Sequence, residues 1–567
     1  MNRIENVKNH ISQNLPDINI LKTISDSVFP AGFGDIDFDK NTISERYDNL
    51  EDHSDDSLFQ QIDGPVKNGV SKKEAYIEMV QADSRGINYL KLSELIEKYG
   101  TCGDYSNIIL PSIIDIPSAQ FNSGSKMLIP GQDKSFIGHV VILSHPEDCY
   151  DIAKRHVKKQ PNFTPLLMDS IISTTDNDNW RKQRDHFTQA FLPNASLKKV
   201  FYKTTDRAKL CVKKLQTEID KNENVNMCDF LLHEANAQLN ITMFGNDKMY
   251  TEENNKIIRD TFKGKTEKGT LRRYMDNLVK NLADSINVNF DPAYNDLLFN
   301  KDKIINGPLG RAMADQEADE ITKWGNGLIF SFAGHDTTGH SMAFFCYEMA
   351  KRPDYQIRLQ DEIDTFFLLN GDRDIKYEDL KHFKFLSRCW TEILRLWPAI
   401  PNGTFRELQY DDYITGSNGE DIKLPKGTYV QITNWVKHRS KLLWGNDVNI
   451  FNPDREFHDN ELWNNQDFAA YNPYSYRFSP FTYPPRDCIG KNFAQMEARV
   501  ILIYLFSKFT FKLDKCFDNF DHSKYYGINR GTLSPIDPGK IIKRNGFETF
   551  ERGMPLIPVK RFINSKL

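Results

Sequence analysis

The sequence predicts a mixed fold in which long helices are combined with shorter β-prone segments. A continuous helix is expected over residues 321–351, and an apolar helix over residues 491–508. Residues 139–143 are expected to form a strand, and a proline-started helix follows over residues 146–155. Residues 425–427 form a turn between two further β-prone runs. Both helical and β-rich regions are therefore expected.

Cys488 stands in a turn-rich segment that runs directly into an apolar helix. The free N–H groups and the positive dipole end of that helix favour a thiolate over a thiol. Arg486 adds a fixed positive charge, and Pro484 and Pro485 stiffen the approach to the cysteine. Gly490 removes a Cβ where the backbone and a flat ligand would otherwise collide. A lone cysteine is usually just a small buried hydrophobe, but these neighbours indicate a metal ligand.

A second segment of chemical interest is Ala-Gly-His-Asp-Thr-Thr at residues 333–338, inside the expected long helix. Glycine and threonine are poor helix formers, and a threonine hydroxyl can donate to a carbonyl one turn earlier. A turn opened in this way can hold an oxygen molecule or water. The alternative is an ordinary Asp-Thr cap at a helix break. Helical periodicity places these residues on the face of Thr337: Ile329, Phe330, Ala333 and Gly334. We expect this face of the helix to contact a ligand, and we expect His335 to point away from it.

Two pairs of side chains lie at helical spacing. Glu392 and Arg395 are three residues apart in an amphipathic helix that Pro398 stops, so their charged groups can pair. Trp180 and Arg184 are four residues apart and share one side of another helix. Surface helices carry such pairs routinely, and an exposed ion pair contributes little to stability. Neither pair by itself indicates a function.

Taken together and in order, the four segments resemble the cytochrome P450 family. The order of Phe481, Arg486, Cys488 and Gly490 resembles its haem-binding loop, in which the cysteine is the axial ligand of the iron. One position departs from the family pattern, because Pro484 stands where the family usually has glycine. That glycine permits a tight bulge, so the proline implies a different path of the loop.

The resemblance implies a role for each of the other residues. Thr337 is similar to the hydroxyl that hydrogen-bonds the oxygen molecule, and Asp336 to a proton-relay carboxylate. Glu392 and Arg395 resemble a buried structural pair. The Phe-x-Pro-x-Arg segment at 451–455 adds Arg455 to that pair. Contacts to haem, including propionate binding by the arginines, are implied for Trp180, Arg184, Ala333, Arg406, Phe481, Arg486 and Gly490. A substrate pocket is implied for Ile329, Phe330, Ala333 and Ile400.

The resemblance covers about residues 89–561 and implies a mainly α fold with a smaller β-rich region, a single large domain of the cytochrome P450 type. It implies a haem-thiolate monooxygenase that uses haem b and O₂ and inserts one oxygen atom into an organic, apolar substrate. No flavin, Fe–S or nucleotide motif is apparent, so electrons are expected from a separate ferredoxin, flavodoxin or P450-reductase-type protein. Arg181, Lys182 and Lys491 are candidates for its docking surface.

Two other functions stay open. A haem-thiolate isomerase or dehydratase would rearrange peroxides without a reductase, although it would not need the proton relay of Asp336 and Thr337. A non-catalytic haem-binding sensor would explain Pro484 as a sign of relaxed catalytic demands.

The N-terminal sequence predicts an acidic, polar and flexible extension over residues 1–85, ahead of a catalytic domain over 86–567. Residues 31–63 contain ten acidic residues against two basic ones. The first twenty residues are too polar for a signal peptide or a spanning helix, so we expect a soluble, cytoplasmic enzyme without a transmembrane anchor. The eight cysteines show no Cys-x-x-Cys pair and are expected to be reduced. A sequence pI near 6.3 argues mildly against a nucleic-acid partner.

Overall fold

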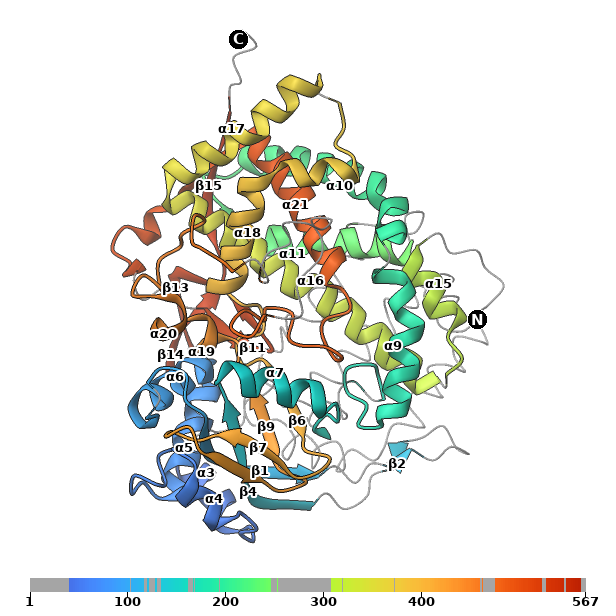
Figure 1. Ribbon diagram of the computed structural model, residues 1–567. Coiled ribbons are helices and arrows are strands. Elements are labelled where there is room, and N and C mark those ends of the chain that lie inside the picture. Colours follow the sequence, from blue (N-terminus) through green and yellow to red (C-terminus); the bar gives the residue numbers. More distant parts are fainter. Residues whose placement is uncertain are drawn as a thin grey trace.

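The computed structural model describes most of residues 40–245 and 307–561, together with Glu252. The larger gaps within these ranges cover residues 122–127, 162–166 and 462–474. Figure 1 shows a β-rich part at the bottom and a larger helical part above it. This arrangement is the mainly α fold with a smaller β-rich region that the sequence predicts.

The described helices are distributed along the whole of this range. They are α3 (Lys40–Asp48), α4 (Asp56–Gln61), α5 (Lys72–Ser84), α6 (Asn88–Tyr99), α7 (Pro146–Arg155), α9 (Asn177–Phe191), α10 (Asn194–Ile219), α11 (Met227–Gln238), the π-helix η2 (Leu239–Phe244), α15 (Pro308–Asp315), α16 (Glu320–Lys351), α17 (Pro353–Asn370), the 3₁₀ helix η3 (Tyr377–His382), α18 (Lys384–Leu396), α19 (Trp435–His438), α20 (Lys441–Trp444), α21 (Lys491–Lys508) and the 3₁₀ helix η5 (Lys515–Phe517).

The strands form one larger sheet and several small ones. The larger sheet has the order β1 (Ile108–Ile116), β4 (Lys134–Leu143), β9 (Tyr429–Ile432), β6 (Thr404–Glu407), and a second has the order β10 (Phe509–Leu513), β15 (Pro555–Lys560), β5 (Val225–Asn226). Two-stranded sheets pair β2 (Gln120–Phe121) with β3 (Leu128–Ile129), β7 (Asp412–Thr415) with β8 (Asp421–Leu424), β11 (Ile528–Arg530) with β12 (Thr532–Ser534), and β13 (Ile536–Arg544) with β14 (Phe547–Arg552).

The register of the larger sheet brings together segments that are far apart in the sequence. β4 pairs antiparallel with β1 and parallel with β9, so that Val141 lies opposite Val430. β6 pairs antiparallel with the other edge of β9 and places Arg406 opposite the same Val430. β6 also contacts the chain just after α7, because the N–H of Glu407 donates to the carbonyl of Lys158 at 3.0 Å.

The long helix α16 runs through the helical part, where it packs against α11, α18 and α21. Its glycines allow this packing, because a Cβ at Gly339 would lie 2.8 Å from the Cα of Leu232 on α11. A Cβ at Gly334 would lie 2.8 Å from the side chain of Leu239. α16 is continuous from Glu320 to Lys351, so the alternative of a capped helix break at residues 336–337 is excluded.

Several predicted elements agree closely with the structure. The helices predicted over 146–155 and 491–508 are α7 and α21, and the helix predicted over 321–351 is α16 with one residue added. The strand predicted over 139–143 is the second half of β4. The predicted turn at 425–427 lies between β8 and β9.

The prediction of a flexible extension over residues 1–85 is not met by its described part. Residues 40–84 contain α3, α4 and α5, which lie beside the larger sheet in Figure 1. Leu58 and Phe59 on α4 are buried in one cluster with Val141 of β4. Arg46 on α3 pairs with Asp115 of β1 at 3.1 Å. These tertiary contacts outweigh the acidic composition. Residues 1–39 lie outside the described part.

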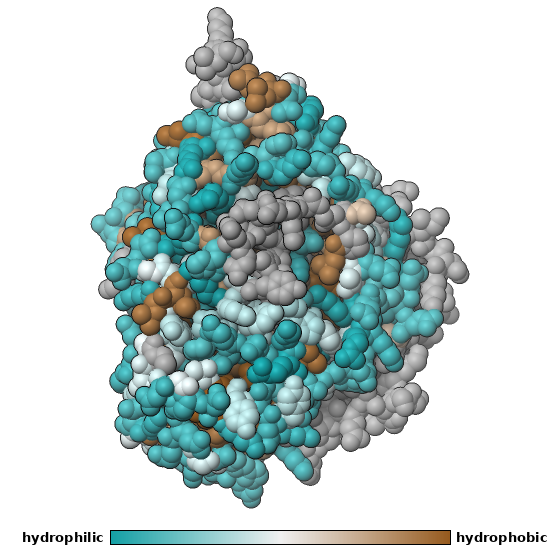
Figure 2. Space-filling view, viewed as in Figure 1, coloured by the Kyte–Doolittle hydropathy of each residue, from teal (hydrophilic) through white to brown (hydrophobic). Residues whose placement is uncertain are grey.

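The surface shown in Figure 2 is mainly hydrophilic, with apolar residues in small separate groups. Within the described residues, no helix combines the length and the apolar composition that a membrane span requires.

Candidate functional site

The loop that carries Cys488 is closed by backbone hydrogen bonds. The N–H of Cys488 donates to the carbonyl of Phe481 at 3.0 Å, and the N–H of Thr482 donates to that of Ser479 at 3.0 Å. Thr482 has a φ of 59°, a region that residues other than glycine rarely adopt. Gly490 is the N-cap residue of α21, and a Cβ there would meet only Phe191, at 3.9 Å. The protein itself therefore leaves room above this glycine.

The sequence predicted that the start of α21 would favour the thiolate of Cys488, but burial has the larger effect. The Cys488 side chain is accessible to water, yet it lies so deep among protein atoms that burial raises the pKa of its thiol. Asp487 raises that pKa further, whereas the N–H of Gly490, Lys491 and Arg184 lower it. A metal cation bound to this sulfur would favour its thiolate form.

Trp180 and Arg184 on α9 both face this loop, but they differ in their contacts. The guanidinium of Arg184 donates to the carbonyl oxygen of Asp487 at 2.6 Å and to its carboxylate at 2.7 Å. Lys491 pairs with the same carboxylate. Arg184 thus holds the cysteine loop, and its binding of a propionate stays a prediction. Trp180 is buried, and the guanidinium of Arg486 lies 4.7 Å from its ring centre.

Three buried cations lie close enough together to repel one another. Burial and the charges of Arg406 and Arg486 lower the pKa of Lys159. Burial lowers the pKa of Arg406 to about 10, and burial followed by the charge of Arg406 lowers that of Arg486 to about 9. Lys159 and Arg406 both donate to the hydroxyl of Thr404, in the second case at 2.7 Å. Among the described residues no carboxylate pairs with any of the three.

Guanidinium nitrogens in this cluster also lack hydrogen-bond acceptors. Nε and Nη2 of Arg406 and Nε and Nη1 of Arg486 are buried without a partner. Such groups are costly unless an anion binds them. The two carboxylates of a haem have the charge and the acceptor atoms to satisfy them, so the residues present fit this group. The sequence did not predict that Lys159 belongs to this cluster, because nothing near it in the sequence separates it from a solvated surface lysine.

The α16 segment has the internal hydrogen bond that the sequence predicts. The hydroxyl of Thr337 donates to the carbonyl of Ala333, one turn earlier, at 2.8 Å. Ala333 is exposed and Thr337 is partly exposed, whereas His335 is buried and its Nδ1 lies 2.6 Å from the carbonyl of Ser331. Ala333 and Thr337 therefore share an open face of the helix.

Asp336 is buried on another side of α16, against the C-terminal strands. Its carboxylate accepts from the hydroxyl of Thr532 and lies 3.7 Å from Arg552 and 3.5 Å from His340. Burial alone would raise the pKa of Asp336, but His340, Arg552, His335 and the bond from Thr532 together hold it below its usual value. Asp336 is therefore a carboxylate at neutral pH. Thr532 and Arg552 carry no sequence signal that links them to it.

The residues predicted to line the substrate pocket divide into two groups. Ala333 is exposed, and Ile329 and Ile400 are partly exposed. Phe330 is buried instead, with its ring centre 4.8 Å from that of Phe187 on α9. It therefore fills the contact between α16 and α9.

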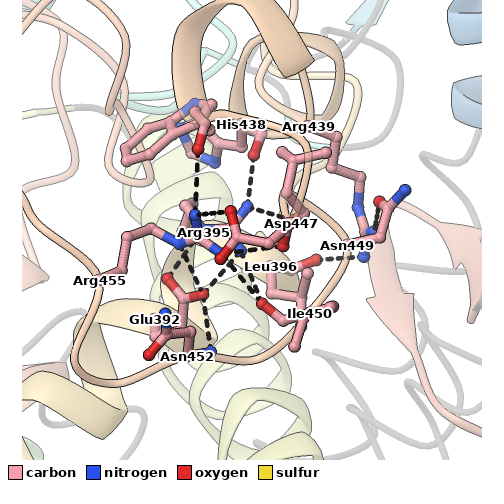
Figure 3. A network of polar contacts seen from close by, with 12 residues as sticks. Glu392, Arg395, Leu396, His438, Arg439, Asp447, Asn449, Ile450, Asn452 and Arg455 are labelled. Atoms are coloured by element: carbon pink, nitrogen blue, oxygen red, sulfur yellow. Dashed lines mark hydrogen bonds and ion pairs between the residues drawn. The ribbon is translucent and has the colours of Figure 1, made fainter.

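The predicted structural network is present and fully buried (Figure 3). Arg395 donates to both oxygens of Glu392, at 2.8 and 2.7 Å, and Arg455 donates to Glu392 at 3.1 Å. Arg395 also donates to the carbonyls of His438 and Val448, at 2.7 and 2.8 Å. These contacts join α18 to the chain between α19 and residue 455.

Comparison with known proteins identifies the family. The sequence profile described as cytochrome P450 matches residues 138–288 and 270–535, which together make up more than half of the chain. The chain belongs to the cytochrome P450 family. As a P450 it is a monooxygenase-type oxidoreductase that uses a haem iron with a thiolate ligand and O₂.

Several curated P450s are similar to this one. Cytochrome P450 3A12 of Canis lupus familiaris is 25% identical over 424 residues, which cover 69% of this chain and 78% of that protein. Cytokinin hydroxylase of Arabidopsis thaliana is 34% identical over 194 residues, or 34% of this P450 and 33% of the relative. Putative cytochrome P450 CYP13A5 of Caenorhabditis elegans is 30% identical over 194 residues, or 34% of each chain.

Proposed function

We propose that this P450 inserts one oxygen atom of O₂ into an apolar organic substrate, with haem b held by Cys488 and electrons delivered by a separate protein. The observation that carries the proposal is the presence of two features in one loop. Cys488 stands in a closed loop with Phe481 and Arg486, and among the described residues no carboxylate pairs with the buried guanidinium groups of Arg406 and Arg486. A metal ligand and an anion site together suit an iron porphyrin.

The haem, when bound, supplies the iron centre at which O₂ is reduced and cleaved. The sulfur of Cys488 donates electron density to that centre. Lys159, Arg406 and Arg486 would bind the propionates, and the ring of Trp180 supports Arg486 from behind. The protein thus fixes the orientation of the cofactor before substrate arrives.

Proton supply is assigned to α16. The carboxylate of Asp336 stays ionised at neutral pH, so it can accept a proton from water. The hydroxyl of Thr337 faces the open side of the helix and can donate its proton into the pocket once it leaves the carbonyl of Ala333. Each turnover consumes two protons and two electrons, and it yields the hydroxylated product and water.

The electron donor is proposed to dock beside α9 and the start of α21. Lys182 is exposed there, whereas Arg181 pairs with Asp178 at 3.0 Å and Lys491 pairs with Asp487. Lys182 is thus the strongest of the three docking candidates. A donor of the ferredoxin, flavodoxin or P450-reductase type stays a prediction. A cytoplasmic location of the enzyme also stays a prediction. We also propose that the catalytic domain includes α3 to α5, because they share its core.

The proposed function is tested with Cys488→Ser. Reduced wild-type protein exposed to carbon monoxide should show thiolate-type absorption, and the variant should not. With a generic reductase, wild-type protein should consume NAD(P)H and O₂ in step with product. Turnover of an organic peroxide without reductant would favour the isomerase instead, and an intact haem spectrum without any turnover would favour the sensor. An unchanged spectrum in Cys488→Ser would contradict the proposal.

A further inference from the structure

The short helix α19 connects the Glu392 network to the cysteine loop. The carbonyl of His438 accepts from Arg395, and Nε2 of the same histidine accepts from the backbone N–H of Ser479 at 2.9 Å. The hydroxyl of Ser479 donates to Asn434, just before α19, at 3.0 Å. Ser479, at the start of the cysteine loop, is therefore bonded through its backbone to α19 and through its side chain to the residue just before α19.

Lys437 on α19 reaches further along the loop. Its fully buried ammonium group donates to the hydroxyl of Ser479 at 2.8 Å and to that of Tyr483 at 2.6 Å, and it lies 4.4 Å from the ring centre of Tyr483. Among the residues that the structure describes, no carboxylate forms an ion pair with Lys437. One cation thus joins two points of the loop that precede Cys488.

Holding this cation inside the protein is costly. Burial lowers the pKa of Lys437 to about 8, which shows that the interior disfavours its charge even though the nearby thiol of Cys149 opposes the shift. An apolar side chain of similar length would avoid that cost. A purely structural role for Lys437 would therefore carry an electrostatic cost that an apolar side chain would not.

The loop at this point needs support from outside. Thr482 occupies the left-handed region with a φ of 59°, and Pro484 stands where the P450 family usually has glycine. Between them, Tyr483 is buried, donates to the carbonyl of Tyr476, and packs edge-on against Tyr150 with ring centres 5.5 Å apart. Lys437 thus holds the buried side chain that lies between these two positions of the loop.

We propose that Lys437 is a positioning residue for the haem-thiolate loop, in which its ammonium group holds Ser479 and Tyr483 and thereby fixes the path of the chain to Cys488. The proposal rests on the proposed function, in which Cys488 ligates the haem iron. Lys437 touches neither substrate nor cofactor in this role. Its effect is exerted on the geometry of the thiolate.

The test uses the full-length, haem-loaded protein and the substitution Lys437→Met, which keeps the length of the side chain and removes its charge and donors. We expect the haem-free variant to resist chemical denaturation as well as wild type or better. The haem-loaded variant should show a smaller share of thiolate-type absorption with carbon monoxide and should release haem about tenfold faster. The control is Lys441→Met, which removes an exposed lysine on α20 and should behave as wild type.

A second variant separates this role from general packing. Tyr483→Phe removes one of the two acceptors of Lys437, so its effect on haem release should be less than additive with that of Lys437→Met. Full thiolate-type absorption and wild-type haem release in Lys437→Met would overturn the proposal. A loss of thiolate-type absorption that only parallels a loss of stability would also overturn the proposal. Absence of thiolate-type absorption in wild type would instead overturn the proposed function itself.

Discussion

Two groups of buried cations in this P450 differ in whether the protein supplies the anion. Arg395 and Arg455 share the carboxylate of Glu392, and their other donors reach backbone carbonyls and, from Arg455, the carboxylate of Asp447. Arg406 and Arg486 have guanidinium nitrogens without any acceptor. The first group is complete as folded, and this marks it as structural. Among the described residues nothing completes the second group, and this supports the proposal that an anionic ligand binds there.

The largest effect is expected from Glu392→Gln. The substitution leaves Arg395 buried without a countercharge, while Arg455 keeps its ion pair with Asp447, so it should lower the free energy of unfolding of the haem-free protein by about 3–5 kcal/mol. Chemical denaturation measures this loss. The matched control is Glu456→Gln, an exposed glutamate one residue beyond Arg455, which should change stability by less than about 0.5 kcal/mol. A loss below about 1 kcal/mol for Glu392→Gln would show that the two groups do not differ as described.

Arg406→Met is expected to change the stability of the haem-free protein in the opposite direction. Removing a buried charge that no anion offsets should raise the free energy of unfolding of the haem-free protein by about 1 kcal/mol or more. The same variant should bind haem about tenfold more weakly, because a propionate loses its partner. Denaturation and haem titration measure the two effects. Lys423→Met, at an exposed position of β8, should change neither. Lower stability together with normal haem affinity would contradict the assignment.

The uncompensated cluster also predicts a pH dependence. The pKa of Lys159 is lower in the folded than in the unfolded chain, so the unfolded chain binds more protons in the interval up to the ordinary value of 10.5. The cost of burying this charge is therefore present at low pH and is relieved as the pH rises through that interval. Haem-free Lys159→Met should be more stable than wild type, and its advantage should shrink as the pH approaches 10.5. An advantage that grows with pH would contradict the mutual repulsion.

A smaller effect is expected from Arg184→Gln. Arg184 holds the cysteine loop through Asp487, but Lys491 pairs with the same carboxylate and partly replaces it. Haem release should become a few-fold faster, on the order of a 1 kcal/mol change. Stopped-flow transfer of haem to an acceptor protein measures the rate. A loss as large as that of Arg406→Met would instead support the prediction that Arg184 binds a propionate.

Local sequence signals predicted the parts of this molecule that depend on local structure. Pro146 marks the start of α7, and the spacing of Glu392 and Arg395 places their charges on one side of α18. The contacts of Lys159 with Thr404 and of Asp336 with Thr532 span 245 and 196 residues, and nothing local encodes them. The acidic composition before residue 63 predicted a flexible segment. Composition alone does not show that Leu58 and Phe59 have a sheet to pack against.

The glycine contact between α16 and α11 restricts where α16 can lie. At Gly339 the backbones of the two helices approach so closely that no Cβ fits. A larger residue there would displace α16 and, with it, the open face that Ala333 and Thr337 share. The close contact at Gly339 therefore fixes the axis of the helix, and the shape of that open face is left to the side chains that project from it.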